Sequence, residues 1–346
     1  MGNITRNTQY IDWLGEERPF FGNFIAATSE VPPSPTPTPS VTPQISPTPT
    51  NTETPTPTVT PTNTITPTTT TTPTPTPTLP QGTTEAYAYL NAVVTAGGSV
   101  DATMSAATIT FYQQLYSNSL WDSLYAFYPF IGGTNAAHAV EGKLTYTITW
   151  NGGITSSVSG LIGNGTNGYG NTGFNPFSDI GDGNTSSMGV YVTILGAVGN
   201  RVYDAGADEY IGDPLEKAYN IASRRVAGAT NQNLFDAGDY FPSGYGRVES
   251  TTTDGTGMTI GTARSDADRE LYRNGSSVAT QTNARTIEYT NRVVYFAAQN
   301  NNGVPNWYNS NTWGFFFMGK GLSDTEVSTL STLINNYQTS LGRNTY

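Results

Sequence analysis

The proline- and threonine-rich tract from Pro32 to Pro80 most constrains what this chain can fold into. Sixteen of its 49 residues are proline, and most of the rest are threonine. Proline fixes φ and lacks a backbone N–H, so neither a helix nor a sheet can continue through the tract. It has almost nothing apolar to bury and cannot offset the entropy lost on folding. We therefore expect residues 32–80 to form an extended linker, at most about 150 Å long, between a head and a C-terminal part.

The head, residues 1–31, carries many large apolar side chains but is too short to fold alone. Such a segment gains order by docking on a partner surface, with its aromatic side chains as anchors. The alternative is that it packs on the chain's own C-terminal domain. We favour an anchoring peptide that binds another subunit through the following residues: Tyr10, Trp13, Leu14, Phe20, Phe21 and Phe24.

Charge and composition exclude several classes of partner. The net charge is −11 with only 15 Lys and Arg residues, which disfavours nucleic acid and anionic membranes as partners. No apolar stretch is long enough to span a membrane, and residues 1–31 lack the pattern of a secretion signal. An extracellular type of linker without an export signal fits a protein that is carried outside as part of a particle.

Three segments have the apolar spacing of amphipathic helices. Thr84–Gly98 and Thr103–Trp121 make up a helical base, residues 81–123, which packs under a β domain or against copies of itself. The second arrangement would make the protein a homo-oligomer. The third helix, Leu322–Arg343, begins with a predicted capping box of Ser323 and Glu326.

Residues 124–346 show the short alternating segments and Gly/Asn turns of a mainly β fold. Leu144–Trp150 alternates strictly between apolar residues and threonine, and Asn274-Gly275 is typical of a hairpin turn. A β-sandwich or jelly roll is therefore predicted. The other strand candidates are Met188–Leu195, Gly257–Arg264, Glu270–Arg273, Ser277–Gln281, Arg285–Thr290, Val293–Ala298 and Trp313–Met318.

Several of these segments resemble known families. LYAFYPFIGGTNAAH (124–138), WNGGITSSVSG (150–160) and NGTNGYGNTGFNP (164–176) resemble a recurring domain of bacteriophage virion proteins. ELYRNGSSVA (270–279) and GFFFMGKGLSDTEVSTL (314–330) are similar to concanavalin A-like lectin/glucanase folds. The resemblance implies a lectin-like jelly roll on a virion surface, as in a head fibre, a capsid decoration protein or a tail protein. Residues 1–31 would then contact capsid, neck or tail subunits. The stretch after His138 is shorter here than in the phage pattern.

Asp266, Asp268 and Glu270 are candidates for catalysis. On a strand, their alternation would place three carboxylates on one face, as in jelly-roll glycosidases that use two carboxylates. The alternative is a polar turn between two strands, whose acids are neutralised by Arg264, Arg269 and Arg273. We favour the turn, and a protein that is not an enzyme.

Two Gly-rich loops supply oxygen atoms that calcium could use. Neither has the spacing of an EF-hand, and solvated turns are the alternative. We expect no cofactor, with calcium as the candidate if there is one. The first loop contains Asp179, Asp182 and Asn184, and the second Asp204, Asp208 and Glu209. His138 is the one histidine; no G-x-S-x-G motif accompanies it, and we expect a hydrogen-bonded structural residue in a loop.

Aromatic residues within polar loops are the best candidates for ligand binding. A flat ring accepts the C–H face of a sugar, and neighbouring amides bind its hydroxyls. The alternative is that these rings close the core or line subunit contacts. The sequence predicts adhesion to host-surface or environmental glycans; a purely structural fibre protein and a glycoside hydrolase are the other hypotheses. The candidates are Tyr169 with Asn167 and Asn171, Trp307 with Asn306 and Asn309, and Tyr245.

Overall fold

A computed structural model describes residues 9–11, 17–19, 79–181, 183–197, 201–210, 216–241, 246–284 and 286–346. The chain divides into two compact units, Met1–Thr78 and Leu79–Tyr346. In the first unit, β1 (Gln9–Ile11) pairs antiparallel with β2 (Glu17–Pro19). Tyr10 lies in β1, and the remaining predicted anchor residues are outside the described residues: Trp13, Leu14, Phe20, Phe21 and Phe24. The anchoring role stays a prediction.

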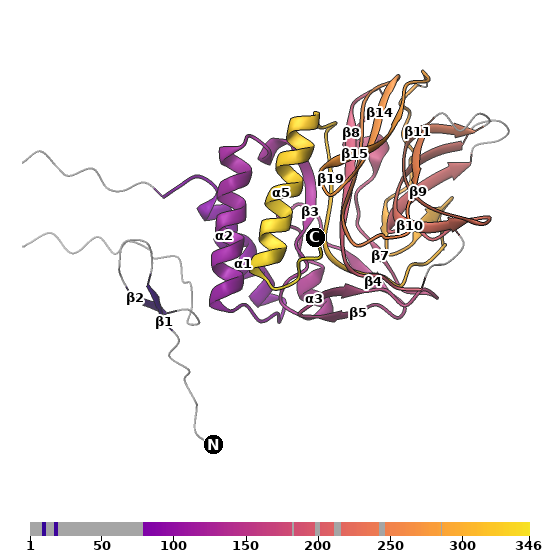
Figure 1. Ribbon diagram of the computed structural model, residues 1–346. Helices are drawn as coiled ribbons and strands as arrows, with labels where there is room; N and C mark the ends of the chain where they lie inside the picture. Colours follow the sequence, from indigo (N-terminus) through magenta and orange to yellow (C-terminus); the bar gives the residue numbers. More distant parts are fainter. Residues whose placement is uncertain are drawn as a thin grey trace, which may run out of the picture. The chain divides into compact units, whose positions relative to one another are not determined.

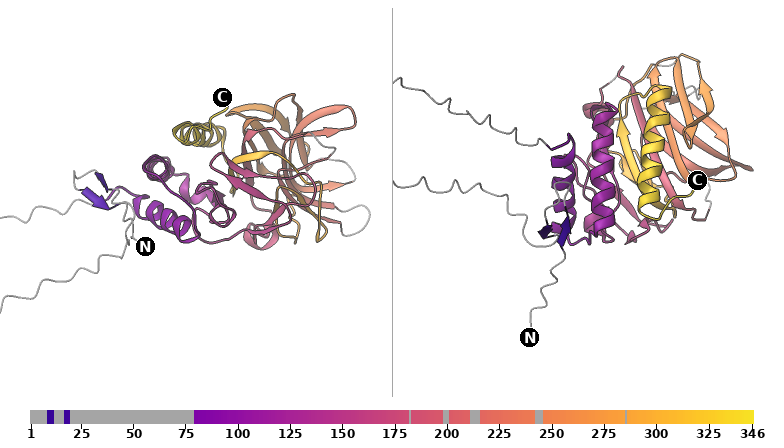
Figure 2. Two further views of the ribbon diagram at one scale, coloured as in Figure 1. Left: turned by 90° about the horizontal axis from the view of Figure 1, so that it is seen from below. Right: turned by 60° about the vertical axis from the view of Figure 1, so that its left-hand side comes forward.

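The second unit has three layers (Figures 1 and 2). Three helices, α1 (Thr83–Thr95), α2 (Ala102–Ser117) and α5 (Asp324–Ser340), lie on one side of a β-sheet. The other face of this sheet packs against a second sheet, which lies furthest from the helices. The predicted mainly β sandwich, with helices before and after it, is confirmed. None of the described helices is long and apolar enough to cross a membrane.

The sheet beside the helices has eight strands within the described part of the chain. All of its pairings are antiparallel, and β3 (Leu124–Tyr128) joins it through β19. The order of the other strands is β15 (Ser276–Gln281), β14 (Asp268–Arg273), β13 (Gly257–Ser265), β8 (Ser186–Ile194), β19 (Thr312–Gly319), β6 (Gly160–Ile162) and β5 (Thr155–Ser157).

The sheet far from the helices has nine strands within the same described ranges. A hairpin of β17 (Gln299–Asn301) and β18 (Val304–Asn306) joins it where β17 pairs parallel with β9. The order of the other strands is β12 (Arg247–Thr251), β11 (Thr230–Phe241), β10 (Glu216–Ala227), β9 (Ala205–Tyr210), β16 (Tyr295–Phe296), β7 (Tyr169–Asn171) and β4 (Thr149–Asn151).

Aromatic side chains fill the space between the layers. Between the two sheets, the Phe296 ring lies 4.8 Å from that of Trp313 and 4.7 Å from that of Phe316, measured between centroids. Between the helices and the eight-stranded sheet, Phe111 of α2 lies 5.4 Å from Phe315 of β19 and 5.1 Å from Tyr337 of α5. These rings are buried, so the helices are an integral layer of the fold.

All three predicted helices are confirmed, each a few residues shorter than expected. Their beginnings follow from local capping. Asp101 Oδ1 accepts a 2.8 Å hydrogen bond from the Met104 N–H at the start of α2. Ser323 and Glu326 form both halves of the predicted capping box of α5.

The five predicted strands that lie in the eight-stranded sheet are confirmed, although β3, β5 and β6 of that sheet were not predicted, and several other strand predictions were wrong. Leu144–Trp150 is not one strand: Leu144 has a φ of 61°, outside the β region, and regular pairing covers only Thr149–Asn151. Arg285–Thr290 has no strand among its described residues, and Val293–Ala298 contains only Tyr295–Phe296. The strands from β9 to β12 were not predicted.

His138 lies in a short helix, α3 (Asn135–His138), and not in a loop. It is 1% exposed, and neither ring nitrogen has a hydrogen-bond partner among the described residues. The prediction of a hydrogen-bonded histidine was therefore wrong. Burial, assisted by the nearby Arg343 charge, lowers the pKa of His138 to about 3.

This burial makes stability depend on pH. In the unfolded chain His138 binds a proton as pH falls through about 6.5, the pKa of a free histidine. In the folded protein it stays neutral down to about pH 3. Falling pH therefore favours the unfolded state between these values, by up to about 1.4 kcal/mol per pH unit. We expect His138→Leu to remove this dependence.

Urea denaturation at pH 7.5 and pH 4.5 measures how the free energy of unfolding depends on pH. The wild type should lose about 2.7 kcal/mol relative to His138→Leu on acidification. Carboxylates titrate in both proteins, so they cancel in the difference. An equal change in the two proteins would contradict a buried neutral histidine.

Candidate functional site

The acidic turn lies where β13 ends and β14 begins, so the predicted polar turn is confirmed. Arg264 Nη1 lies 2.9 Å from Glu270 Oε2 and 3.4 Å from Asp268 Oδ1. The Asp266 carboxylate binds a different segment of the chain, where its Oδ1 accepts a 2.9 Å hydrogen bond from the Ile287 N–H. The three carboxylates therefore do not converge.

The electrostatics of this turn also fit a structural role. Burial raises the pKa of Glu270, but hydrogen bonds from Ser277, Tyr272 and Arg264 outweigh it and lower the pKa below its usual value. A glycosidase acid has the opposite shift, because it must hold a proton near neutral pH. Arg264 also contacts Asp324, 2.6 Å away at the start of α5. The network thus joins the sheet to that helix.

The residues of the first predicted calcium loop bind within the protein. Asp179 Oδ2 accepts a 2.8 Å hydrogen bond from the Asn175 N–H, and Asn184 Nδ2 donates to the Ile180 carbonyl at 2.8 Å. Asp182 is outside the described residues. No group of three or more acidic or histidine side chains suited to a metal ion occurs in the described ranges. These residues stay candidates for calcium only.

In the second of these loops, Asp204 is fully buried and holds two parts of the chain together. Its carboxylate accepts hydrogen bonds from Trp313 Nε1 at 2.7 Å, Asn311 Nδ2 at 2.9 Å, Asn309 Nδ2 at 3.1 Å and the Ser223 N–H at 2.5 Å. Burial raises the pKa of the Asp204 carboxyl, and these hydrogen bonds oppose the rise. With its lone pairs occupied, Asp204 is a structural residue.

One row of side chains crosses the nine-stranded sheet on the face turned away from the core. Neighbouring members pair in register from strand to strand. At the usual strand spacing the row is roughly 24 Å long. From β12 to β7 it consists of Arg247, Asp236, Asn220, Gly206, Tyr295 and Asn171.

The polar half of this row is a continuous hydrogen-bonded network. Arg247 binds both oxygens of Asp236 at 2.6 and 2.7 Å, and Asn220 Nδ2 donates to Asp236 Oδ2 at 3.0 Å and to Asp208 Oδ1 at 2.7 Å. Gly206 is required because a Cβ there would collide with the Asn220 amide. Asp236 and Asn220 are fully buried, so this half is a rigid floor.

Three tyrosine rings gather at the other half of the row, and a tryptophan lies over β10 and β11. Tyr169 of β7 lies 4.7 Å from Tyr295 and 6.5 Å from Tyr308, between ring centroids. Trp307 lies 6.1 Å from Tyr203, which packs with Ala222 and Leu234. Tyr169, Trp307 and Tyr308 are half-buried and can present ring faces to a ligand. We call these three side chains the aromatic cluster.

Trp307 is held in a strained conformation. Its φ is 48°, in the left-handed region that bulky residues rarely adopt. Asn306 Oδ1 accepts a 2.8 Å hydrogen bond from the Trp307 N–H, and the Trp307 carbonyl accepts one from the Tyr203 N–H at 3.2 Å. Strain of this kind is concentrated at functional sites.

Burial raises the pKa of both Tyr295 and Tyr308, and Tyr169 adds to the effect. Their hydroxyl groups therefore remain protonated at neutral pH, and that of Tyr308 donates a 3.1 Å hydrogen bond to the Pro305 carbonyl. Beside the half-exposed rings, the cluster thus offers the mixture of apolar faces and polar groups that ligand sites contain.

Some of the amides predicted to bind a ligand beside the Tyr169 and Trp307 rings are hydrogen-bonded within the protein instead. Tyr169 and Trp307 both lie on the outer side of the nine-stranded sheet, but Asn309 is 2% exposed and bound to Asp204. Asn167 Oδ1 accepts from the Gly153 N–H at 3.1 Å, and Asn171 Oδ1 from the Gly173 N–H at 3.0 Å. Asn306 is exposed beside Trp307, and Tyr245 is outside the described residues.

Comparisons with known proteins give distant similarities of fold. No protein-family profile matches this sequence, and none of the curated proteins is significantly similar to it. Domain 4 of AbnA, a GH43 extracellular arabinanase from Geobacillus stearothermophilus, was solved in complex with arabinotriose. It is 14% identical to this chain, with a TM-score of 0.36 over 60% of this chain and 98% of that domain.

Two further solved structures are similar over the same share of this chain. The binding domain of botulinum neurotoxin DC, in complex with SialylT, is 13% identical with a TM-score of 0.40, over 62% of this chain and 52% of that one. A Trypanosoma rangeli sialidase in complex with 2,3-difluorosialic acid is 15% identical with a TM-score of 0.38, over 60% of this chain and 33% of that one. The alignments thus span about half and a third of these two proteins. Similarity at this level says nothing about a shared ligand or reaction.

Proposed function

We propose that the C-terminal unit binds carbohydrate without modifying it, through the aromatic cluster on the outer face of the nine-stranded sheet. The observation that carries this proposal is the contact of Tyr169 with Tyr308 from distant parts of the chain, beside the half-buried Trp307 that precedes Tyr308 in the sequence. Half-exposed rings suit the C–H faces of sugars, and the exposed Asn306 suits their hydroxyl groups.

A rigid floor supports this use. Arg247 and the buried Asp236 and Asn220 form a hydrogen-bonded network across β12, β11 and β10, in the same sheet as the strand that carries Tyr169. Preorganised rings lose little conformational entropy on binding. The acidic turn favours binding over hydrolysis, because Asp268 and Glu270 share Arg264 as an ion-pair partner.

We further propose that the protein is a surface component of a phage particle. Residues 1–31 would bind a capsid, neck or tail subunit, and the Pro/Thr linker would carry the sandwich outward. The sequence resemblance to phage virion domains supports this placement, as do the apolar head and the extended linker. Several tethered copies would raise the effective concentration, so weak single sites would suffice for adhesion.

The experiment is an array of bacterial surface polysaccharides and mucin glycans, probed with the full chain. We expect binding to a subset of the glycans without release of reducing sugars. A folded protein that binds none of them would contradict carbohydrate binding and favour a purely structural fibre protein. Release of sugar from a bound glycan would contradict the non-enzymatic proposal.

A further inference from the structure

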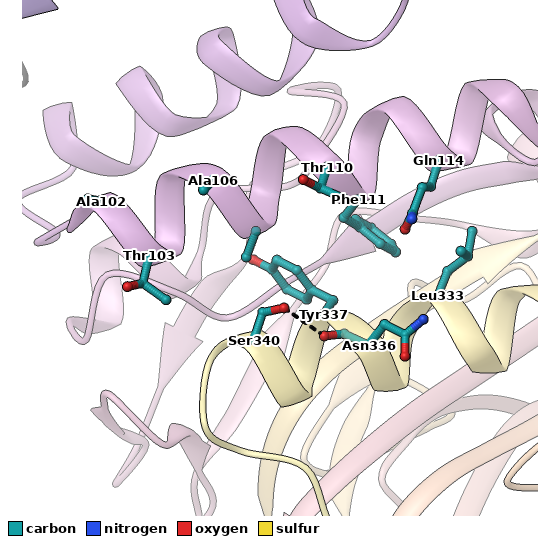
Figure 3. Close-up of a pocket in the computed structure, with 11 residues that line it drawn as sticks. Ala102, Thr103, Ala106, Thr110, Phe111, Gln114, Leu333, Asn336, Tyr337 and Ser340 are labelled. Carbon is teal, nitrogen blue, oxygen red and sulfur yellow. Dashed lines mark hydrogen bonds between the residues drawn. The ribbon is translucent and has the colours of Figure 1, made fainter. Parts of the chain in front are cut away.

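An open groove runs between α2 and α5 on the outer side of the helical layer (Figure 3). Its volume is about 490 Å³. The rings of Phe111 and Tyr337 form its floor, and Tyr337 is fixed by a 3.2 Å hydrogen bond to Thr108. Small side chains form its walls, among them Ala106 and Thr110 of α2. The groove is therefore apolar at its base and lies far from the aromatic cluster.

Charge is sparse along the two helices that form this groove, and the exposed N-cap Asp101 lies next to the lining residue Ala102. α2 contains no charged residue over its whole length, and α5 has none after its first turn. The acids of that first turn, Asp324 and Glu326, are engaged with Arg264 and Ser323. Exposed helix faces are normally rich in charged residues, whereas the centres of protein interfaces are depleted of them.

We propose that this groove binds the same groove of a second copy of the chain, forming a two-fold symmetric dimer through α2 and α5. The charge distribution selects this partner. With a net charge of −11, two copies repel each other over most of their surfaces. The helical face carries few charges, so it is where two such copies can approach with the least repulsion.

The shape of the face also fits a copy of itself. The exposed residues Ala102, Ala106 and Thr110 follow one another every four positions along α2, forming a ridge of small side chains. Ridges of this kind pack into the groove between two facing helices. In a two-fold arrangement each copy supplies both a ridge and a groove, so the contact is self-complementary.

The dimer would also suit a tethered binding protein. The chain enters the C-terminal unit at Leu79, just before α1, which packs on α2 through stacked rings of Tyr89 and Tyr112. The linkers of two copies would thus begin near the interface. The nine-stranded sheets lie on the opposite side of each copy (Figure 1), so their outer faces would point away from each other.

The available area sets the strength of the contact. α2 is about 24 Å long, and two adjacent helices present a face about 20 Å wide, which gives about 500 Å² per copy. A standard interface buries about 800 Å² per partner. The dimer should therefore be weak, with a dissociation constant in the micromolar range.

Analytical ultracentrifugation of the full chain from about 1 to about 300 µM tests the dimer. We expect the average mass to rise from 36.9 kDa toward twice that value with concentration. Ala106→Arg should raise the dissociation constant at least tenfold, because it fills the groove and adds like charges. Ser328→Arg is the matched control: it adds the same charge to α5 at an exposed position that does not line the groove.

Each outcome supports or contradicts the proposed dimer. A monomer at every concentration would overturn the proposal. So would a dimer that Ala106→Arg leaves intact, since another surface, such as residues 1–31, would then hold the copies together. Circular dichroism of both variants checks that the exposed substitutions leave the fold unchanged. An equal effect of both variants would show a non-specific effect of charge, and would also contradict the assignment of this groove.

Discussion

Replacing Asp204 with alanine is expected to lower the free energy of unfolding by about 4 kcal/mol. The variant leaves four N–H groups without their acceptor in the interior: those of Ser223, Asn309, Asn311 and Trp313. Each buried donor without a partner costs about 1–3 kcal/mol, and water entering the new space recovers part of this. Urea denaturation followed by tryptophan fluorescence measures the change.

Asp122→Ala is the matched control, since Asp122 is exposed and its loss should change stability by less than about 0.5 kcal/mol. Asp204→Asn should fall between the two. It keeps the shape of the side chain but replaces one acceptor oxygen with a donor that faces other donors. A loss below about 1 kcal/mol for Asp204→Ala would contradict its central position in the sandwich.

Replacing Glu141 with alanine is expected to lower the free energy of unfolding by about 3 kcal/mol. Glu141 is fully buried, and its carboxylate accepts hydrogen bonds from the N–H groups of Phe127 at 2.9 Å, Lys143 at 2.9 Å and Thr145 at 3.0 Å. Burial raises the pKa of Glu141, and these hydrogen bonds oppose the rise. Removing the carboxylate leaves three backbone donors without an acceptor, so the turn after His138 should detach from β3.

Glu141→Gln distinguishes the contributions of the two carboxylate oxygens to stability. Oε1 serves Phe127 and Lys143, and Oε2 serves Thr145, so glutamine can keep the first two bonds and lose the third. We expect a loss of about half that of alanine. Glu249→Ala, an exposed glutamate of β12, is the matched control. Hydrogen exchange of the Thr145 amide should accelerate in both Glu141 variants; unchanged exchange would contradict the assigned bond.

The parts of the fold that the sequence predicts are those set by local interactions. α5 has its apolar stripe within its 17 residues and its cap, Ser323, directly before them, and the β14–β15 hairpin has its Asn-Gly turn. β10 and β11 could not be found in this way. Both faces of these strands are buried, with Tyr219 and Phe235 on one face and Asn220 and Asp236 on the other. Alternation of polar and apolar residues therefore does not distinguish a buried face from an exposed one.

The same reasoning applies to the candidate site. Tyr169 and Trp307 were predicted as ligand-binding residues because each is a large aromatic residue in a polar segment, where the sequence suggests no core for it to pack in. Tyr295 was missed because it lies in a two-residue strand whose partners come from distant segments. Asn309 was assigned to a ligand but binds Asp204, because the sequence does not reveal which amides the interior needs.

The most direct test of carbohydrate binding is the affinity of Tyr308→Ala for a glycan selected on the array, measured by isothermal titration calorimetry. Phe177→Ala is the control, because Phe177 is a 47% exposed aromatic residue of α4 (Pro176–Asp179) outside the aromatic cluster. We predict that Tyr308→Ala binds at least tenfold more weakly, about 1.4 kcal/mol, and that Phe177→Ala binds like the wild type. Equal affinity of all three proteins would contradict the assignment of the binding face.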